Sequence, residues 1–170
     1  NGIIERNLLN QAVLADSPLL PGSWAHEPAT WPTVDLDAAR ELLATARLRT
    51  STSDETPEPT VSGAPILSFS LMVLDEPALV QIATEIAAQW SQLNVQVTVD
   101  PVTAATLQQR LEAGDFDAAM AELSLSGSAD PDVYQFWDQG RNYGGVNDRR
   151  TAEDLERARR DPNGLNRAEF

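Results

Sequence analysis

The sequence contains no lysine and no cysteine, and its only histidine is His26. Without lysine, the chain has no GKS or GKT phosphate-binding loop and no lysine that forms a Schiff base. Without cysteine, it has no thiol nucleophile, no disulfide and no cysteine-ligated metal site. One histidine provides no pair of metal ligands and little material for a Ser-His-Asp triad. We therefore expect no catalytic residue, no metal site and no cofactor.

Positive charge is also scarce. The chain carries 26 acidic residues against 12 basic ones, all of them arginine, and its formal net charge is −14. Such a chain repels nucleic-acid phosphates and anionic lipid headgroups, so we expect no nucleic-acid partner. No apolar run approaches the ~18 residues of a membrane-spanning helix. The apolar fraction of 42% is typical of a globular protein, and 170 residues suffice for one domain with a core.

Residues 65–99 contain the most regular hydrophobic pattern. An alternation of period two over residues 67–73, in which Met72 falls on the polar side, predicts a β-strand. Apolar residues then recur at helical spacing, after Asp75 as the predicted N-cap and Pro77 in the first turn. Residues 95–99 alternate again and predict a second strand. Strand, helix and strand form a βαβ unit, in which we expect parallel strands and a right-handed crossover.

A second helix and strand follow this unit. Residues 103–114 predict a helix that ends at a glycine, and residues 116–125 predict an apolar strand. Residues 130–132 open a short helix with acidic residues at its positive end. A charged helix is predicted from Thr151, with a capping box over residues 151–154.

The residues before the βαβ unit predict two helices and two loops. Residues 3–13 are apolar at positions that suit a short helix, and a turn-rich loop follows. Asp35 is the predicted N-cap of a helix that ends near residues 47–49. Residues 50–65 are rich in Ser, Thr, Glu and Pro without apolar periodicity, which predicts a mobile surface loop. The chain lacks an initiator Met and ends inside an apparent amphipathic helix pattern, so we expect it to be part of a longer protein.

Four stretches carry a recognisable order of motifs. They are SPLLPGSWAH at residues 17–26, VDLDAARELL at residues 34–43, the βαβ pattern of residues 67–99, and GDFDA at residues 114–118 followed by DPD at residues 130–132. In this order they resemble the family 5 extracellular solute-binding proteins of bacterial ABC importers. The resemblance spans nearly the whole chain.

The resemblance implies a fold and a function. The fold would be α/β, a βαβ-containing lobe of a type II periplasmic-binding-protein-like fold, with residues 1–170 forming a truncated single lobe of a two-lobed clamp. The function would be capture of a peptide or other small polar solute between the lobes and its delivery to the permease subunits of an ABC transporter. The protein would be a monomeric, non-enzymatic, extracytoplasmic binder, in the periplasm or anchored at the cell surface as a lipoprotein.

The predicted ligand site follows the third strand, because open α/β sheets present ligand groups at the carboxyl ends of their strands. We predict that it comprises Ser124, Ser126, Gly127, Ser128, Asp130 and Tyr134. In relatives that bind peptides, an acidic residue at the position of Gly127 receives the ligand's amino terminus. Its replacement here predicts recognition of an uncharged polar group through hydroxyls and amides.

Several residues also have purely structural interpretations. Trp90 and Phe116 are expected in the core, and packing within the lobe is more frequent for a residue such as Tyr134 than ligand contact. Asp130 is first a helix N-cap, and the apolar residues that follow argue against a calcium site. His26 is expected to be a surface residue in its loop.

Two rival functions remain open from the residues alone. One is a hydrolase or transferase domain that uses carboxylates, for which the candidates are Asp115, Asp117, Glu122 and Asp130. Asp115 and Asp117 are not expected to act as an acid–base pair. The other rival is a non-catalytic interaction domain.

Overall fold

The computed structural model describes residues 2–17, 19, 21–24, 26–30, 33–46, 65–122, 134–137 and 142–161. The chain divides into two compact units. The sheet unit comprises Thr33–Leu107 and Phe116–Ala121. The helical unit comprises Asn1–Pro32, Gln108–Asp115 and Glu122–Phe170.

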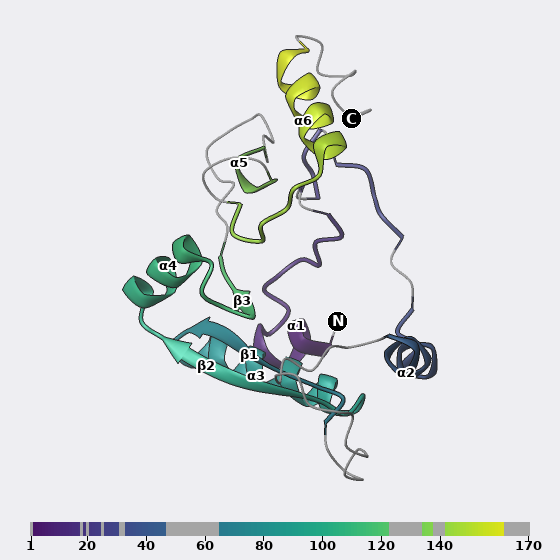
Figure 1. Cartoon of the computed structure of the whole chain (residues 1–170), viewed down its shortest axis with the longest axis vertical. Coiled ribbons are helices and arrows are strands. Elements are labelled where there is room, and N and C mark those ends of the chain that lie inside the picture. The colour runs from purple at the N-terminus through teal and green to yellow at the C-terminus, as the bar shows by residue number, and fades with distance from the viewer. Residues whose placement is uncertain are drawn as a thin grey trace, which may run out of the picture. The chain divides into compact units, whose positions relative to one another are not determined.

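The sheet unit is built on three parallel strands in the order β2-β1-β3 (Figure 1). They are β1 (Leu67–Leu74), β2 (Val95–Val102) and β3 (Ala118–Met120). β1 pairs with β2 along its whole length and with β3 over residues 71–73. The predicted βαβ unit with parallel strands is therefore confirmed. β3 is shorter than predicted, because residues 121–122 are not in the strand and residues 123–125 lie outside the described residues.

Helix α3 (Pro77–Ser91) supplies the cover for one face of this sheet. The core of the unit consists of Leu71, Val73 and Ala83, surrounded by partly buried apolar residues of α3, β2 and β3. Phe69 and Trp90 add an edge-to-face aromatic contact, with ring centroids 5.8 Å apart. Trp90 was expected in the core, but it is 40% exposed. It lies on the last turn of α3, where the contact with Phe69 covers only part of its ring.

Met72 contradicts the simple alternation predicted for β1. The sequence placed it on the polar side of the strand, yet it is fully buried, like its neighbour Val73. Successive side chains of a strand point to opposite faces, so the burial of Leu71, Met72 and Val73 together shows that β1 is covered on both faces of the sheet, as is usual for parallel sheets.

Two predicted helix caps are also wrong by a few residues. The N-cap of α3 is Glu76, without a side-chain cap bond, and the N–H of Asp75 donates instead to the carbonyl of Val102. The charged helix α6 (Arg149–Arg160) starts before Thr151, because Asp148 is its N-cap and accepts from the N–H groups of Arg150 and Thr151.

The other helices follow the predicted order. In α2 (Leu36–Thr45), the predicted cap Asp35 accepts from the backbone of Asp37 and Ala38. α4 (Ala104–Ala113) ends at Gly114, whose φ is +68°, as expected for a glycine C-cap. α1 (Gly2–Asn7) is shorter than the predicted 3–13, because the backbone turns left-handed at Leu9 and Asn10.

The remaining helix and one predicted loop complete the comparison. α5 (Tyr134–Trp137) contacts α6 within the helical unit. Most of the predicted mobile loop at residues 50–65 lies outside the described residues. No helix in the described part of the chain is long and apolar enough to span a membrane.

The burial of β1 predicts a stability difference between two chemically identical substitutions. Val73 is 0% exposed and Val34 is 90% exposed. We expect Val73→Ala to lower the free energy of unfolding by about 2 kcal/mol, through lost burial and a residual cavity. Val34→Ala should change it by less than about 0.5 kcal/mol. Urea unfolding followed by circular dichroism measures both, and equal costs would contradict the assigned core.

Candidate functional site

The predicted ligand-binding residues fall mainly outside the described part of the chain. Ser124, Ser126, Gly127, Ser128 and Asp130 all lie there, and Tyr134 is the first residue of α5. Their assignment therefore stays a prediction. The described residues do show how the chain reaches them. β3 runs parallel to β1 and ends at Met120, so the chain leaves this sheet at a carboxyl edge shortly before Ser124.

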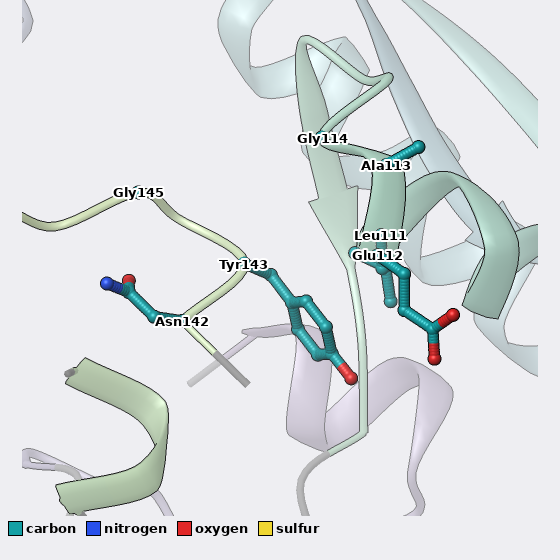
Figure 2. Close-up of a pocket in the computed structure, with 7 residues that line it drawn as sticks. All are labelled: Leu111, Glu112, Ala113, Gly114, Asn142, Tyr143 and Gly145. Atoms are coloured by element: carbon teal, nitrogen blue, oxygen red, sulfur yellow. The ribbon is translucent and has the colours of Figure 1, made fainter. Parts of the chain in front are cut away.

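The helical unit contains a pocket at the end of α4 (Figure 2). Residues 111–114 form one wall, and Asn142, Tyr143 and Gly145 form the other. Its volume is about 340 Å³, which is at the lower end of the range for small-molecule sites. Figure 2 shows the Tyr143 side chain extending from its loop toward α4, whereas the Asn142 side chain points away.

Side-chain hydrogen bonds hold both walls of this pocket. The Gln108 amide donates to Glu112 Oε1 at 2.5 Å and to the Tyr143 hydroxyl oxygen at 3.4 Å. The Asn142 side chain closes its own loop, because its Nδ2 donates to the carbonyl of Val146 and its Oδ1 accepts from the Val146 N–H. Tyr143 therefore lies in a loop whose two ends, Asn142 and Val146, are linked by hydrogen bonds.

Sequence analysis did not find this pocket. Glu112 lies in a helix and Tyr143 in a glycine-containing loop 31 residues later, and no motif connects them. The only local signal was the pair Gly114 and Gly145, which have φ values of +68° and +62°. Glycine marks such turns, but it does not show that two of them line the same hollow.

His26 was expected to be a surface residue of its loop, and the structure shows it partly buried in contact with an acid. Its Nε2 lies 2.6 Å from Asp16 Oδ1, and the two side chains are only 12% and 19% exposed. Asp16 Oδ2 also accepts from the Ala29 N–H at 3.0 Å. The hydrogen bond with His26 is the main cause that lowers the pKa of Asp16. Asp16 thus links to both His26 and Ala29, and these contacts stabilise the turn-rich loop over residues 16–29.

Two of the carboxylates considered for a hydrolase, Asp115 and Asp117, make local contacts with the chain. Asp117 Oδ2 accepts from both the N–H and the hydroxyl of Ser70, each at 2.9 Å. Arg110 contacts Asp115 at two atoms. The Nε of Arg110 donates to the backbone carbonyl of Asp115 at 2.9 Å and lies 3.7 Å from the Asp115 Oδ2. Each acid therefore stabilises a local turn or strand end, and Asp130 lies outside the described residues.

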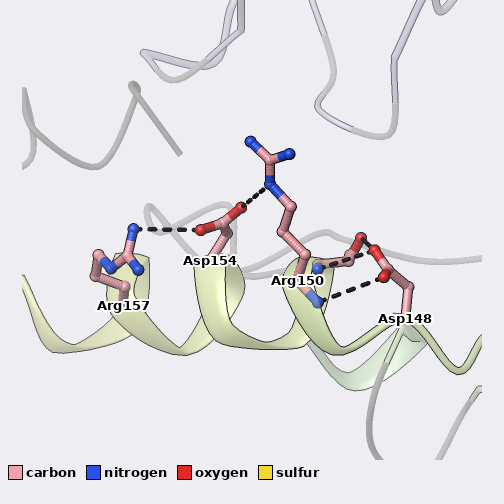
Figure 3. A network of polar contacts seen from close by, with 5 residues as sticks. Asp148, Arg150, Asp154 and Arg157 are labelled. Atoms are coloured by element: carbon pink, nitrogen blue, oxygen red, sulfur yellow. Dashed lines mark hydrogen bonds and ion pairs between the residues drawn. The ribbon is translucent and has the colours of Figure 1, made fainter.

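The densest set of charged contacts lies along α6 (Figure 3). Asp154 pairs with Arg150 at 4.0 Å and with Arg157 at 3.3 Å. The hydrogen bond from the Thr151 hydroxyl is the main cause that lowers the pKa of the N-cap Asp148. These are exposed contacts within one helix. No group of three or more His, Asp or Glu residues in the described ranges could hold a metal ion.

Comparison with known proteins identifies the family. Residues 1–145 match the family described as "Bacterial extracellular solute-binding proteins, family 5 Middle". The chain belongs to this family. The match covers most of the chain, including the two loops that carry the Asp16–His26 contact and the Tyr143 pocket wall. No curated protein is significantly similar to this family 5 chain in sequence.

Solved structures confirm the predicted α/β fold class of this family 5 member. The oligopeptide-binding protein AppA from Bacillus subtilis, in complex with a nonapeptide, has a TM-score of 0.78 at 20% identity. NikZ from Campylobacter jejuni, in complex with Ni(L-His), has a TM-score of 0.76 at 19% identity. Each comparison covers 99% of this chain and 34% of the other.

NikA from Staphylococcus aureus, in complex with Ni(L-His)2, is similar to the same extent. Its TM-score is 0.77 at 17% identity, over 99% of this chain and 34% of NikA. The family 5 chain therefore spans about a third of the length of the solved structures it matches. At these identities the likeness establishes the fold.

The Asp16–His26 contact predicts how the turn-rich loop of this family 5 chain responds to acid. The pKa of Asp16 is lowered from its ordinary value of 3.8. A carboxylate with a depressed folded-state pKa stabilises the loop fully above pH ~3.8 and loses this effect as the pH falls through the folded-state pKa. We expect His26→Phe to raise the Asp16 pKa toward 3.8, measured by carboxyl ¹³C NMR.

Asp148 provides the internal control for this titration. Its pKa is also lowered, but by Thr151 and not by His26. It should therefore titrate identically in the wild-type chain and in His26→Phe. An unchanged Asp16 midpoint in the variant would show that the histidine does not hold the carboxylate.

Proposed function

We propose that the chain is part of the substrate-binding component of a bacterial ABC importer. It captures a peptide or another small polar solute between two lobes and delivers it to the permease subunits. The observation that carries this proposal is the family 5 match over residues 1–145. Support also comes from AppA and NikZ, which share the fold and are described with a nonapeptide and with Ni(L-His).

Residues 1–170 form part of one lobe in this proposal. The chain covers about a third of each matched structure, and a clamp that closes on its ligand needs a second lobe. The protein acts as a monomer outside the cytoplasm, where solute-binding proteins of this family meet their ligands. Binding of this kind requires no nucleophile, which agrees with a chain that contains neither lysine nor cysteine.

The proposed ligand site is the segment after β3. It comprises Ser124, Ser126, Gly127, Ser128, Asp130 and Tyr134. The parallel direction of β1, β2 and β3 supports this position, because open α/β sheets bind ligands beyond the carboxyl ends of their strands. Hydroxyls and backbone amides at Gly127 favour an uncharged polar group of the ligand, and the absence of an acid there disfavours a free amine.

The function is tested by identifying what the natural full-length protein carries. Protein purified without denaturation is unfolded in acid, and mass spectrometry identifies the small molecules released. We expect a stoichiometric polar solute, such as a short peptide or a metal chelate. If no solute is released, and neither a tripeptide nor nickel–histidine binds in calorimetry, the proposed function is wrong. Saturable hydrolysis that Asp115→Asn abolishes would favour the hydrolase alternative.

The proposed site predicts that a new acid at Gly127 is harmful. In the full-length protein, Gly127→Asp should weaken binding of the released solute by at least ~1 kcal/mol, about fivefold, because the added carboxylate is buried by the closed clamp without a partner. Calorimetry with the purified solute measures the change.

Two controls accompany this substitution. Gly144→Asp introduces the same side chain where the nearest atom to the new Cβ is 4.0 Å away. Arg157→Ala removes a side chain that is 58% exposed. Both variants should bind the solute like the wild-type protein. If Gly127→Asp folds and binds equally well, the segment after β3 does not line the cleft.

A further inference from the structure

We propose that the pocket at the end of α4 binds a small organic cation, an alkylammonium group on a short aliphatic body. Its lining residues differ from those of the proposed ligand segment, and the inference does not rest on the proposed function. It follows from the charge, the polar contacts and the apolar surfaces of the residues that line the pocket.

The charge around the pocket favours a cation. Glu112 contributes a carboxylate, and none of the lining residues that the structure describes is basic. The pocket also lies at the C-terminal end of α4, where the helix dipole places partial negative charge. The net charge of −14 adds a long-range attraction for cations.

In the described part of the chain, no basic side chain among the lining residues meets this preference. The chain has no lysine, so no side chain can supply an ammonium group. Arg110, two residues before Glu112, is directed at Asp115, whose carbonyl oxygen accepts from its Nε at 2.9 Å. Arg141, which precedes Asn142, lies outside the described residues. Arg110 is not among the residues that line the pocket.

The polar groups of the pocket are fixed in position. Gln108 donates to one carboxylate oxygen of Glu112 and reaches the hydroxyl oxygen of Tyr143. A carboxylate has two oxygens and accepts several hydrogen bonds, so Glu112 can receive an ammonium while it keeps its bond to Gln108. This arrangement reduces the conformational entropy that ligand binding must remove.

The apolar surfaces suit the body of the ligand. Leu111 is buried at the base of α4's last turn, and the Tyr143 ring extends toward this helix (Figure 2). An aromatic face attracts a cation as well as an aliphatic chain. Gly114 and Gly145 leave the rim open, since no atom lies within 4 Å of the Cβ that either position lacks. A volume of about 340 Å³ accommodates a molecule of this size.

The probe for this site is n-butylammonium, with 1-butanol and butyrate as its neutral and anionic counterparts. In ¹⁵N-labelled 170-residue chain, we expect saturable NMR shifts of the Ala113, Gly114 and Gly145 amides at millimolar butylammonium, the affinity range of so small a ligand. Butanol should bind about fivefold more weakly or worse, and butyrate should not bind. Equal binding of butanol, or tighter binding of butyrate, would overturn the proposal.

Variants separate the contribution of the Glu112 carboxylate from that of the Tyr143 ring. Glu112→Gln should weaken butylammonium binding about threefold or more, whereas Glu41→Gln, at another exposed helical glutamate, should have no effect. Tyr143→Phe should stay within about twofold of wild type, and Tyr143→Leu should lose about threefold, because an aromatic ring attracts the cation and a leucine side chain does not. A Glu112→Gln chain that remains folded and binds butylammonium unchanged would also refute the site.

Discussion

Strand β1 pairs in parallel with β2 along its whole length and with β3 over residues 71–73. Parallel strands cannot be joined by a tight hairpin, so each neighbour of β1 requires a crossover of a dozen or more residues. The crossover from β1 to β2 contains α3, and its apolar side packs on Leu71 and Val73. The burial of β1 and the position of α3 are thus two consequences of one pairing scheme, and the core of the sheet unit lies where they meet.

The same pairing scheme decides where the strands end. All three strands run in one direction, so their carboxyl ends face the same edge of the sheet. The N–H of Asp75 donates to the carbonyl of Val102 and ties the ends of β1 and β2 together there. On the other side of β1, Asp117 binds both the N–H and the hydroxyl of Ser70, which fixes the start of β3. The strand that leads toward the proposed ligand segment is therefore anchored before it reaches that segment.

Sequence patterns predicted the helices, strands and caps that depend on neighbouring residues. They missed the burial and contacts that depend on residues elsewhere in the chain. The βαβ unit, the Asp35 cap and the end of α4 at Gly114 were all predicted. The first follows from hydrophobic periodicity, and the other two follow from residue types that favour helix ends. Met72 was misjudged because its burial depends on whether the second face of the sheet is covered, which the alternation within β1 does not show. His26 was misjudged because its partner, Asp16, lies ten residues away in a loop without periodicity. The pocket beside Tyr143 was missed for the same reason, since its walls are remote in sequence.

The distribution of arginine bears on both proposed sites. Four arginines of α6, namely Arg149, Arg150, Arg157 and Arg160, contact carboxylates of the same helix. Exposed pairs of this kind stabilise a helix by only about 0.2–0.5 kcal/mol each, but they neutralise the arginines locally. The other eight arginines then stand against 23 further acidic residues, so the acidic excess persists elsewhere in the chain. We propose a cation for the pocket at the end of α4, whereas the proposed ligand segment has serines around Gly127 and no acid at that position. Because the two proposals rest on different residues, occupation of the pocket by an organic cation does not require that the imported solute be cationic.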